Sequence, residues 1–137
     1  MTSGAVLVQQ LEEGDRCLEV TVSGGSVITK GDILKLVDPT TGEPSTASDT
    51  GVTFAGIAKS DKAVGSTEIS RIAVWRNGVF DIAAADGETI TAGDKVCISG
   101  ANTVRRVDNS LISGGCVVGV ALQDAVANEM VEVLVGA

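Results

Sequence analysis

One seven-residue motif occurs twice in this chain in similar form, at an offset of 62 residues. It reads Ile28-Thr29-Lys30-Gly31-Asp32-Ile33-Leu34 in the first half and Ile90-Thr91-Ala92-Gly93-Asp94-Lys95-Val96 in the second. In each copy Gly-Asp precedes an alternating apolar run, which suits a residue that accepts positive φ and a neighbour that hydrogen-bonds its own turn. A phosphate or metal loop can also use Gly-Asp, but two residues are weak evidence for one, and a turn is favoured.

The match continues on both sides of the motif, with one residue inserted on its C-terminal side. The chain is therefore expected to contain two pseudo-repeats, roughly residues 17–75 and 79–137. The further matching positions are Val20 and Ile82, Gly25 and Gly87, Gly56-Ile57-Ala58 and Gly119-Val120-Ala121, and Asp61 and Asp124.

Short alternating apolar runs, separated by Gly, Asn and Asp turns, make up most of the chain. Aromatic residues are only 2% of it, so Val, Ile, Ala and Leu supply the apolar bulk, which favours packed strands. Helical periodicity is absent apart from a possible single turn at 122–128. We therefore predict an all-β fold, a small barrel or sandwich of about ten short strands with little or no helix. The expected strands are residues 17–22, 33–37, 52–58, 69–75, 79–83, 95–99, 103–107, 116–122 and 130–135.

Two stretches between these strands carry clear turn chemistry. Residues 38–51 are the longest polar stretch, contain both prolines, and are expected to form a loop. Asn77-Gly78 lies between two strand-like runs, which is the strongest short signal for a β-hairpin.

A chain of 137 residues fits one domain with a real core. We expect residues 1–12 to form an N-terminal arm and residues 13–137 a single β domain. The arm contains the apolar triplet Val6, Leu7 and Val8, and it either orders against the body or a neighbouring molecule or is a frayed tail. The N-terminus has no signal-peptide pattern and no apolar run approaches the roughly 20 residues of a membrane helix, so a soluble protein made in a cytoplasm is expected.

The charge balance argues against direct binding to nucleic acid. The chain has 10 Lys and Arg against 18 Asp and Glu, a net charge of −8, and Arg105-Arg106 is its only basic doublet. Nucleic-acid backbones require clustered positive charge. An acidic surface fits a soluble protein, or one that meets a basic patch on another protein.

The residue types that catalysis and metal binding most often use are missing. The chain has no His and no Tyr, so a Ser-His-Asp or Cys-His arrangement cannot be built. We expect no enzyme, no cofactor and no metal. The three cysteines lie in apolar runs without CxxC spacing, which predicts buried thiols that stay reduced. The cysteines are Cys17, Cys97 and Cys116.

The carboxylates remain as candidate catalytic residues, although they lie in or beside turns where carboxylates usually face water. They are Glu12-Glu13, Asp81 with Asp86 and Glu88, and Glu129 with Glu132.

Asp61-Lys62-Ala63, between two expected strands, is similar to the lysine hairpin of lipoyl carrier domains. The resemblance covers three residues and a turn, and implies a cofactor carried on Lys62 as the alternative function. Several residues follow Lys62 before a strand resumes, so a loop lysine in solvent is the simpler interpretation.

A series of motifs runs along nearly the whole chain, from residue 13 to residue 137. In order they are Glu13-Gly14-Asp15, Val20-Thr21-Val22-Ser23-Gly24-Gly25-Ser26-Val27 with Lys30-Gly31-Asp32, Phe54-Ala55-Gly56-Ile57-Ala58, Asn77-Gly78-Val79-Phe80-Asp81-Ile82, Thr91-Ala92-Gly93-Asp94-Lys95-Val96, and Val118-Gly119-Val120-Ala121 with a terminal Val-x-Val strand. The series resembles the small decoration proteins, also called capsid cement proteins, of tailed bacteriophages and related archaeal viruses. The chain departs from that pattern at Cys97-Ile98, where the family often has an aromatic pair, and in its expanded 38–51 loop.

The resemblance implies a structural protein of the virion, made in the host cytoplasm, that binds the outer face of the assembled capsid. Its partners would be the major capsid protein and further copies of itself, commonly in a homotrimer, and it would clamp neighbouring capsid subunits. We expect Val6, Leu7 and Val8 to add a strand to a capsid edge. Trp75, the single tryptophan, is expected either in the core or as an interface anchor, with the core favoured.

Overall fold

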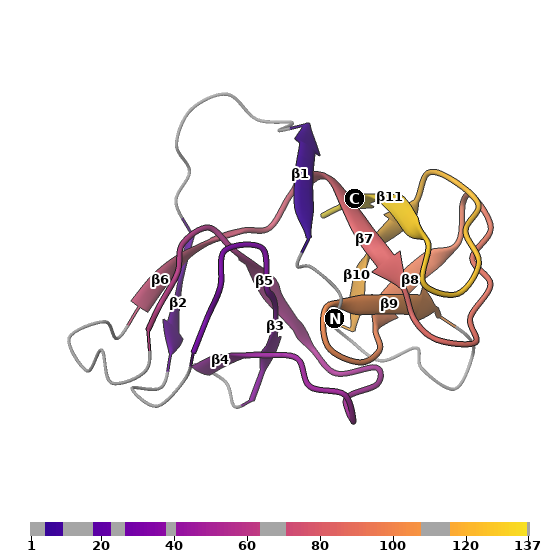
Figure 1. The fold of residues 1–137 in the computed structure, drawn as a ribbon. Helices are drawn as coiled ribbons and strands as arrows, with labels where there is room; N and C mark the ends of the chain where they lie inside the picture. The colour runs from indigo at the N-terminus through magenta and orange to yellow at the C-terminus, as the bar shows by residue number, and fades with distance from the viewer. Residues whose placement is uncertain are drawn as a thin grey trace.

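The chain folds into eleven β-strands in the computed structural model, which describes residues 5–9, 18–22, 27–37, 41–63, 71–107 and 116–136. Within these ranges there is no helix, and accordingly none that is long and apolar enough to cross a membrane. The predicted all-β fold built from two pseudo-repeats is confirmed (Figure 1). The strands are β1 (Val6–Gln9), β2 (Leu18–Val22), β3 (Ile33–Leu36), β4 (Thr41–Pro44), β5 (Phe54–Ala58), β6 (Arg71–Trp75), β7 (Gly78–Ala84), β8 (Lys95–Ile98), β9 (Thr103–Arg106), β10 (Val117–Ala121) and β11 (Met130–Val135).

Each half of the chain closes five strands into a ring with the same topology. In the first half the order is β2-β4-β3-β5-β6, with β6 pairing back to β2. In the second half the order is β7-β11-β10-β8-β9, and β9 pairs back to β7. Among the described strands, the β2–β4 and β7–β9 pairs are parallel and the other pairs are antiparallel. Figure 1 shows the two barrels side by side, with β1 above their junction.

The Gly-Asp turns have the same structure in both barrels. Asp32 accepts a hydrogen bond from the backbone N–H of Thr29 at 2.9 Å, and Asp94 accepts one from Thr91 at 2.9 Å. The glycine before each aspartate has a φ of 95°, a conformation that favours glycine. The prediction that both Gly-Asp pairs form turns is therefore confirmed.

Each Gly-Asp turn also fixes the strand that follows it against a neighbouring strand. The N–H of Gly31 donates to the carbonyl of Ala58 at 2.9 Å, and that of Gly93 donates to Ala121 at 2.8 Å. In the return direction, the N–H of each alanine donates to the carbonyl of the turn aspartate. These bonds set the register of β3 on β5 and of β8 on β10.

A β-bulge interrupts β5 and β10 at the same place. The pairing register shifts beside Gly56 in β5 and beside Gly119 in β10. A Cβ on Gly119 would lie 2.8 Å from the carbonyl carbon of Leu134, and one on Gly56 would lie 2.9 Å from Cβ of Val74. Only glycine lets the neighbouring strand approach this closely.

The two barrels share one hydrophobic cluster across their junction. Ile33 and Ile57 are fully buried there with Phe80 from the second barrel, and the rings of Phe80 and Trp75 lie 5.6 Å apart at 60°. The register places Lys95 at the position of Ile33, and Lys95 is exposed. The outer face of β3 and β5 is thus apolar because the second barrel packs on it.

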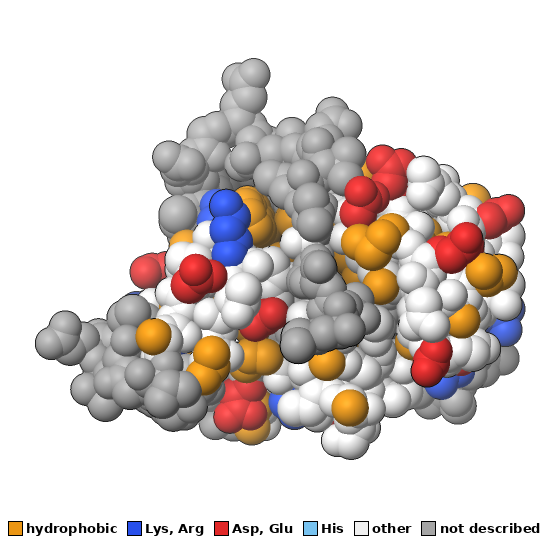
Figure 2. All heavy atoms as spheres, viewed as in Figure 1, with side chains coloured by type: hydrophobic (Ala, Val, Ile, Leu, Met, Phe, Trp, Pro, Cys, Tyr) orange, Lys and Arg blue, Asp and Glu red, His pale blue; other side chains and the backbone are white. Residues whose placement is uncertain are grey.

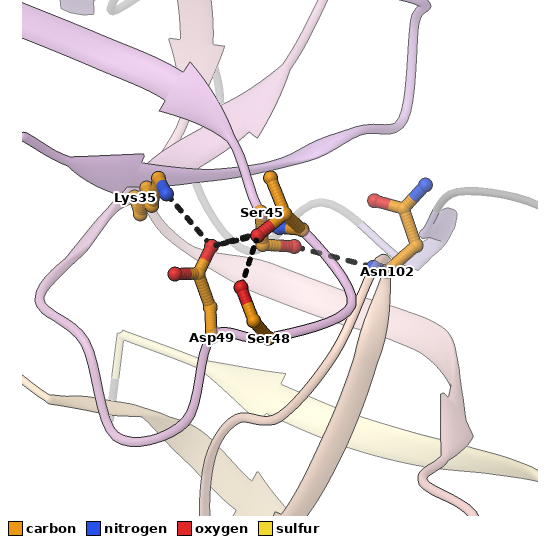
Figure 3. Close-up of polar contacts among 6 residues, drawn as sticks. Lys35, Ser45, Ser48, Asp49 and Asn102 are labelled. Atoms are coloured by element: carbon orange, nitrogen blue, oxygen red, sulfur yellow. Dashed lines mark hydrogen bonds and ion pairs between the residues drawn. The ribbon is translucent and has the colours of Figure 1, made fainter.

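A polar contact centred on Asn102 joins the barrels beside this cluster (Figure 3). Its side-chain oxygen accepts a hydrogen bond from the N–H of Ile33 at 2.9 Å, and its amide nitrogen donates to Asp32 at 3.1 Å. Its own N–H donates to the hydroxyl of Ser45, which is only 6% exposed. Asn102 has a φ of 59°, which asparagine tolerates better than most residues.

The segment after β4 lies in the same junction. The carboxylate of Asp49 is 2.8 Å from Nζ of Lys35 (Figure 3). The backbone carbonyl of Asp49 accepts a hydrogen bond from the N–H of Gly100 in the second barrel at 2.8 Å. Gly51 donates to Ile98 at 2.9 Å. The polar stretch predicted as one loop over 38–51 therefore contains strand β4 and then a segment that hydrogen-bonds to the second barrel.

The predicted hairpin at Asn77-Gly78 is wrong. These residues link β6 to β7, but β6 pairs with β2 and β5, whereas β7 pairs with β1, β9 and β11. Gly78 has a φ of 127°, but the pairing of β6 and β7 is decided by the closure of each barrel. The possible helical turn at 122–128 is also not formed.

We predict that Asn102→Ala lowers the free energy of unfolding by about 2 kcal/mol, because it leaves the N–H of Ile33 without its acceptor and places alanine at positive φ. Denaturant unfolding measures this loss. Asn128→Ala is the matched control, since Asn128 has a φ of 67° and its side chain donates an exposed hydrogen bond to Asp86. Its cost should be about 1 kcal/mol. Equal costs for the two variants would contradict a junction role for Asn102.

We predict that Asp49 stabilises the protein only while ionised. Burial raises the pKa of Asp49, but hydrogen bonds from Lys35 and from the N–H and hydroxyl of Thr46 outweigh it, so its pKa lies below the usual value. The stabilisation is complete above the unfolded pKa of about 4 and is lost as the pH falls through the lower folded value. The difference in unfolding free energy between wild type and Asp49→Asn should therefore be constant above about pH 5 and shrink in acid. A difference that does not change with pH contradicts this assignment.

Candidate interaction surface

Strand β1 holds the three apolar residues that the sequence singled out. Val6 pairs with Asp81 and Leu7 with Phe80, antiparallel to β7, and the register shifts before Gln9. The N–H of Ala5 donates to the carbonyl of Gly31 in the first barrel at 2.6 Å, and Ala5 is only 6% exposed. The segment from Ala5 to Gln9 thus contacts both barrels.

β1 is also the last strand of its sheet. Its order is β1-β7-β11-β10-β8-β9, and no described residue pairs with the far side of β1. The unpaired N–H and C=O groups of an edge strand can accept a strand from another chain. The backbone of Val6, Leu7 and Val8 therefore presents a sheet edge.

Trp75 lies at the junction of the barrels. Its half-buried ring packs against the shared cluster and contacts Phe80. The Nζ atoms of Lys30 and Lys59 lie 6.0 and 5.7 Å from its ring centre. The ring thus combines core packing with two cation–π contacts.

The remaining exposed apolar side chains are spread over the surface. Val117, Leu122, Val126 and Met130 are between 36% and 54% exposed on β10, β11 or their connection, and Val27 and Val37, both 52% exposed, lie in the first half of the chain. On the face seen in Figure 2, apolar side chains lie among acidic ones without forming a broad patch. A groove of about 260 Å³ lies beside this connection. Its lining residues are Thr89, Ile90, Thr91, Asp124, Ala125, Val126 and Glu129.

Comparison with known families and structures explains this architecture. A family model described as phage cement protein matches residues 11–137. The chain belongs to the phage cement protein family. The membership predicted from the motif series is thereby confirmed, and with it a structural protein associated with the phage capsid.

A solved structure shares the fold of this cement protein. It is the N-terminal base of head fibre protein gp8.5 from bacteriophage phi29, with a TM-score of 0.53, 17% sequence identity, and coverage of 87% of this chain and 92% of that one. No curated protein matches the chain. At 17% identity the likeness describes the fold.

Most of the cement protein's candidate carboxylates serve separate structural contacts. Asp86 accepts a hydrogen bond from Asn128 at 2.8 Å, and Glu88 lies 3.6 Å from Arg105. Glu129 accepts the N–H of Val126 at 2.9 Å, and Glu132 accepts from Gln123. Among the described residues, no three His, Cys, Asp or Glu side chains gather as a possible metal site. Glu12 and Glu13 lie outside the described residues.

The alternative function at Lys62 is contradicted, and the interpretation of Lys62 as a loop lysine in solvent is also wrong. Lys62 is only 1% exposed and forms a backbone bridge with Ile28, through hydrogen bonds of 2.9 and 2.7 Å. A carrier lysine must reach other active sites from an exposed hairpin tip, which this position does not allow. The turn at Asp61 instead repeats the one at Asp124 of the second barrel, where Ile90 pairs with Ala125.

The prediction of buried cysteines is confirmed for the two cysteines within the described residues. Cys97 and Cys116 are both buried, at 0% and 1% exposure. Cys17 lies outside the described residues.

Sequence reasoning missed the sheet edge of β2 at Leu18–Glu19, on the side opposite β6, with which no described strand pairs. Alternation identified the strand at residues 17–22, but it cannot tell which side of a strand stays unpaired. The signal that could have found this edge is the repeat itself, because Glu19 occupies in β2 the place of Asp81 in β7.

Proposed function

We propose that this protein binds the outer face of the assembled capsid of its phage and stabilises the shell by clamping neighbouring major capsid subunits. The observation that carries the proposal is the cement-family match over residues 11–137. The two-barrel body and the net charge of −8 fit a soluble protein that is made in the host cytoplasm and added to a finished shell.

Part of the proposed contact is the edge of β1. A capsid segment that pairs with the far side of Val6, Leu7 and Val8 would extend the sheet by one strand. Trp75 is the proposed second anchor, since it packs against the shared cluster and is only half-buried.

The proposed assembly on the shell is a homotrimer. Three linked copies raise the effective concentration of each contact once the first has formed, so weak individual contacts hold together. Many such contacts across the boundaries between capsid subunits would stabilise the shell against the pressure of packaged DNA.

We predict that the purified protein co-sediments with undecorated heads from the same phage, and that decorated heads resist heating better than bare ones. Changing Val6, Leu7 and Val8 to Ser together keeps the backbone donors but removes the apolar side chains proposed to pack against the added capsid strand. This variant should bind heads at least about tenfold more weakly, which is about 1.4 kcal/mol. Sedimentation at a series of protein concentrations measures the affinity.

Val27→Ser is the control, because Val27 is 52% exposed and lies outside β1. It should bind like wild type, and circular dichroism should show that both variants are folded. Wild-type protein that fails to sediment with heads would overturn the proposed function. Unchanged binding of the triple variant would overturn only the part assigned to β1.

A further inference from the structure

The two barrels differ at one sheet edge. Along one side of β7 two strands follow one another, β1 at Val79–Asp81 and β9 at Ala83–Ala84. On the corresponding side of β2, β4 pairs with Thr21 and Val22, as β9 does with β7. No described strand takes the place of β1 on β2.

The register identifies the backbone groups at this edge. Glu19 pairs with Ala73 of β6 as Asp81 pairs with Glu132 of β11, so Glu19 and Asp81 are equivalent. One residue further along the strand, Val20 pairs with Ile72, as Ile82 does with Val131. The two strands therefore have the same orientation in their barrels.

The direction of the backbone N–H and C=O groups of Glu19 can be inferred from the backbone hydrogen bonds of β7 in the second barrel. Ala84 exchanges backbone hydrogen bonds with residues 128 and 129, on the β11 side, whereas Ala85 donates to Val104 of β9. Because successive residues of a strand point their N–H and C=O groups to opposite sides, Asp81 directs its own toward β1. By equivalence, Glu19 directs its N–H and C=O to the open side of β2, and its side chain is exposed.

We propose that the edge of β2 at Leu18–Glu19 binds an extended segment of the major capsid protein, antiparallel to β2, in the way that β1 binds β7. This inference rests on the proposed function. Unpaired donors and acceptors at an edge strand are a template for such a strand, and the second barrel shows that this edge accepts one.

The structure favours another protein over a second copy of this chain as the occupant. Each chain has one β1, and that strand is already on β7, with Ala5 buried in the shared cluster and bonded to Gly31. A second copy could donate its β1 only by breaking these contacts. The exposed carboxylate of Glu19 and the net charge of −8 favour a segment with Lys or Arg opposite Glu19.

The test compares Glu19→Pro with Glu19→Ala in sedimentation with undecorated heads. Proline removes the outward N–H and puts its ring at the edge, while the β6 side of the strand is untouched. Alanine keeps the N–H. We expect Glu19→Pro to bind at least about tenfold more weakly than Glu19→Ala, which should remain within about threefold of wild type because it loses one exposed charge pair.

Hydrogen exchange on the wild-type protein gives a second measurement that needs no variant to fold. The peptide that contains Glu19 should exchange more slowly on heads than in solution. Equal binding of the two variants, or unchanged exchange, overturns this inference while wild-type binding keeps the proposed function. A mass change of the free protein in Glu19→Pro alone, seen by light scattering, assigns the edge to a second copy and also overturns it.

Discussion

The hydrogen bonds around the two Gly-Asp turns fix the register on which each barrel depends. Each turn is held by its own aspartate and by the strand that carries the bulge glycine. A slip of one residue there would turn every side chain of β3 or β8 to the opposite face. Ile33 would then leave the cluster that the barrels share, and the junction would lose its packing.

The two barrels pack on each other because equivalent positions on their outer faces differ in burial and in residue type. Phe54 is 6% exposed where β5 meets the second barrel, whereas Val117, its equivalent in β10, is 36% exposed. The barrels keep the same backbone pairing, but the second has the exposed Lys95 at the position of the buried Ile33, and its valine on this face stays exposed. Asn102 and the segment after β4 add polar contacts around the same junction.

The repeat and the strands could be predicted from the sequence because they depend on local alternation and on turn residues. β4 was missed because Thr41-Gly42-Glu43-Pro44 has no apolar alternation, and it is a strand only through its neighbours β2 and β3. The hairpin at Asn77-Gly78 failed for the same reason, since long-range closure decided the pairing. Family membership was predictable because its motifs are turns and strand segments that are contiguous in the sequence, whereas the open edge of β2 depends on where β1 pairs.

A structural role on the capsid depends on surfaces that remain available after the barrels close. In the described part of the chain these are the far side of β1 and the open side of β2, which lie on different barrels. Two sheet edges on different barrels are the geometry that the proposed clamp on two capsid subunits requires.

Cryo-electron microscopy of heads with and without the protein tests this account most directly. The account predicts additional density on the outer surface, over the contacts between capsid subunits, into which the two barrels fit with their sheet edges toward the shell. Absence of ordered density on the outer surface, or density confined to the interior, would contradict it.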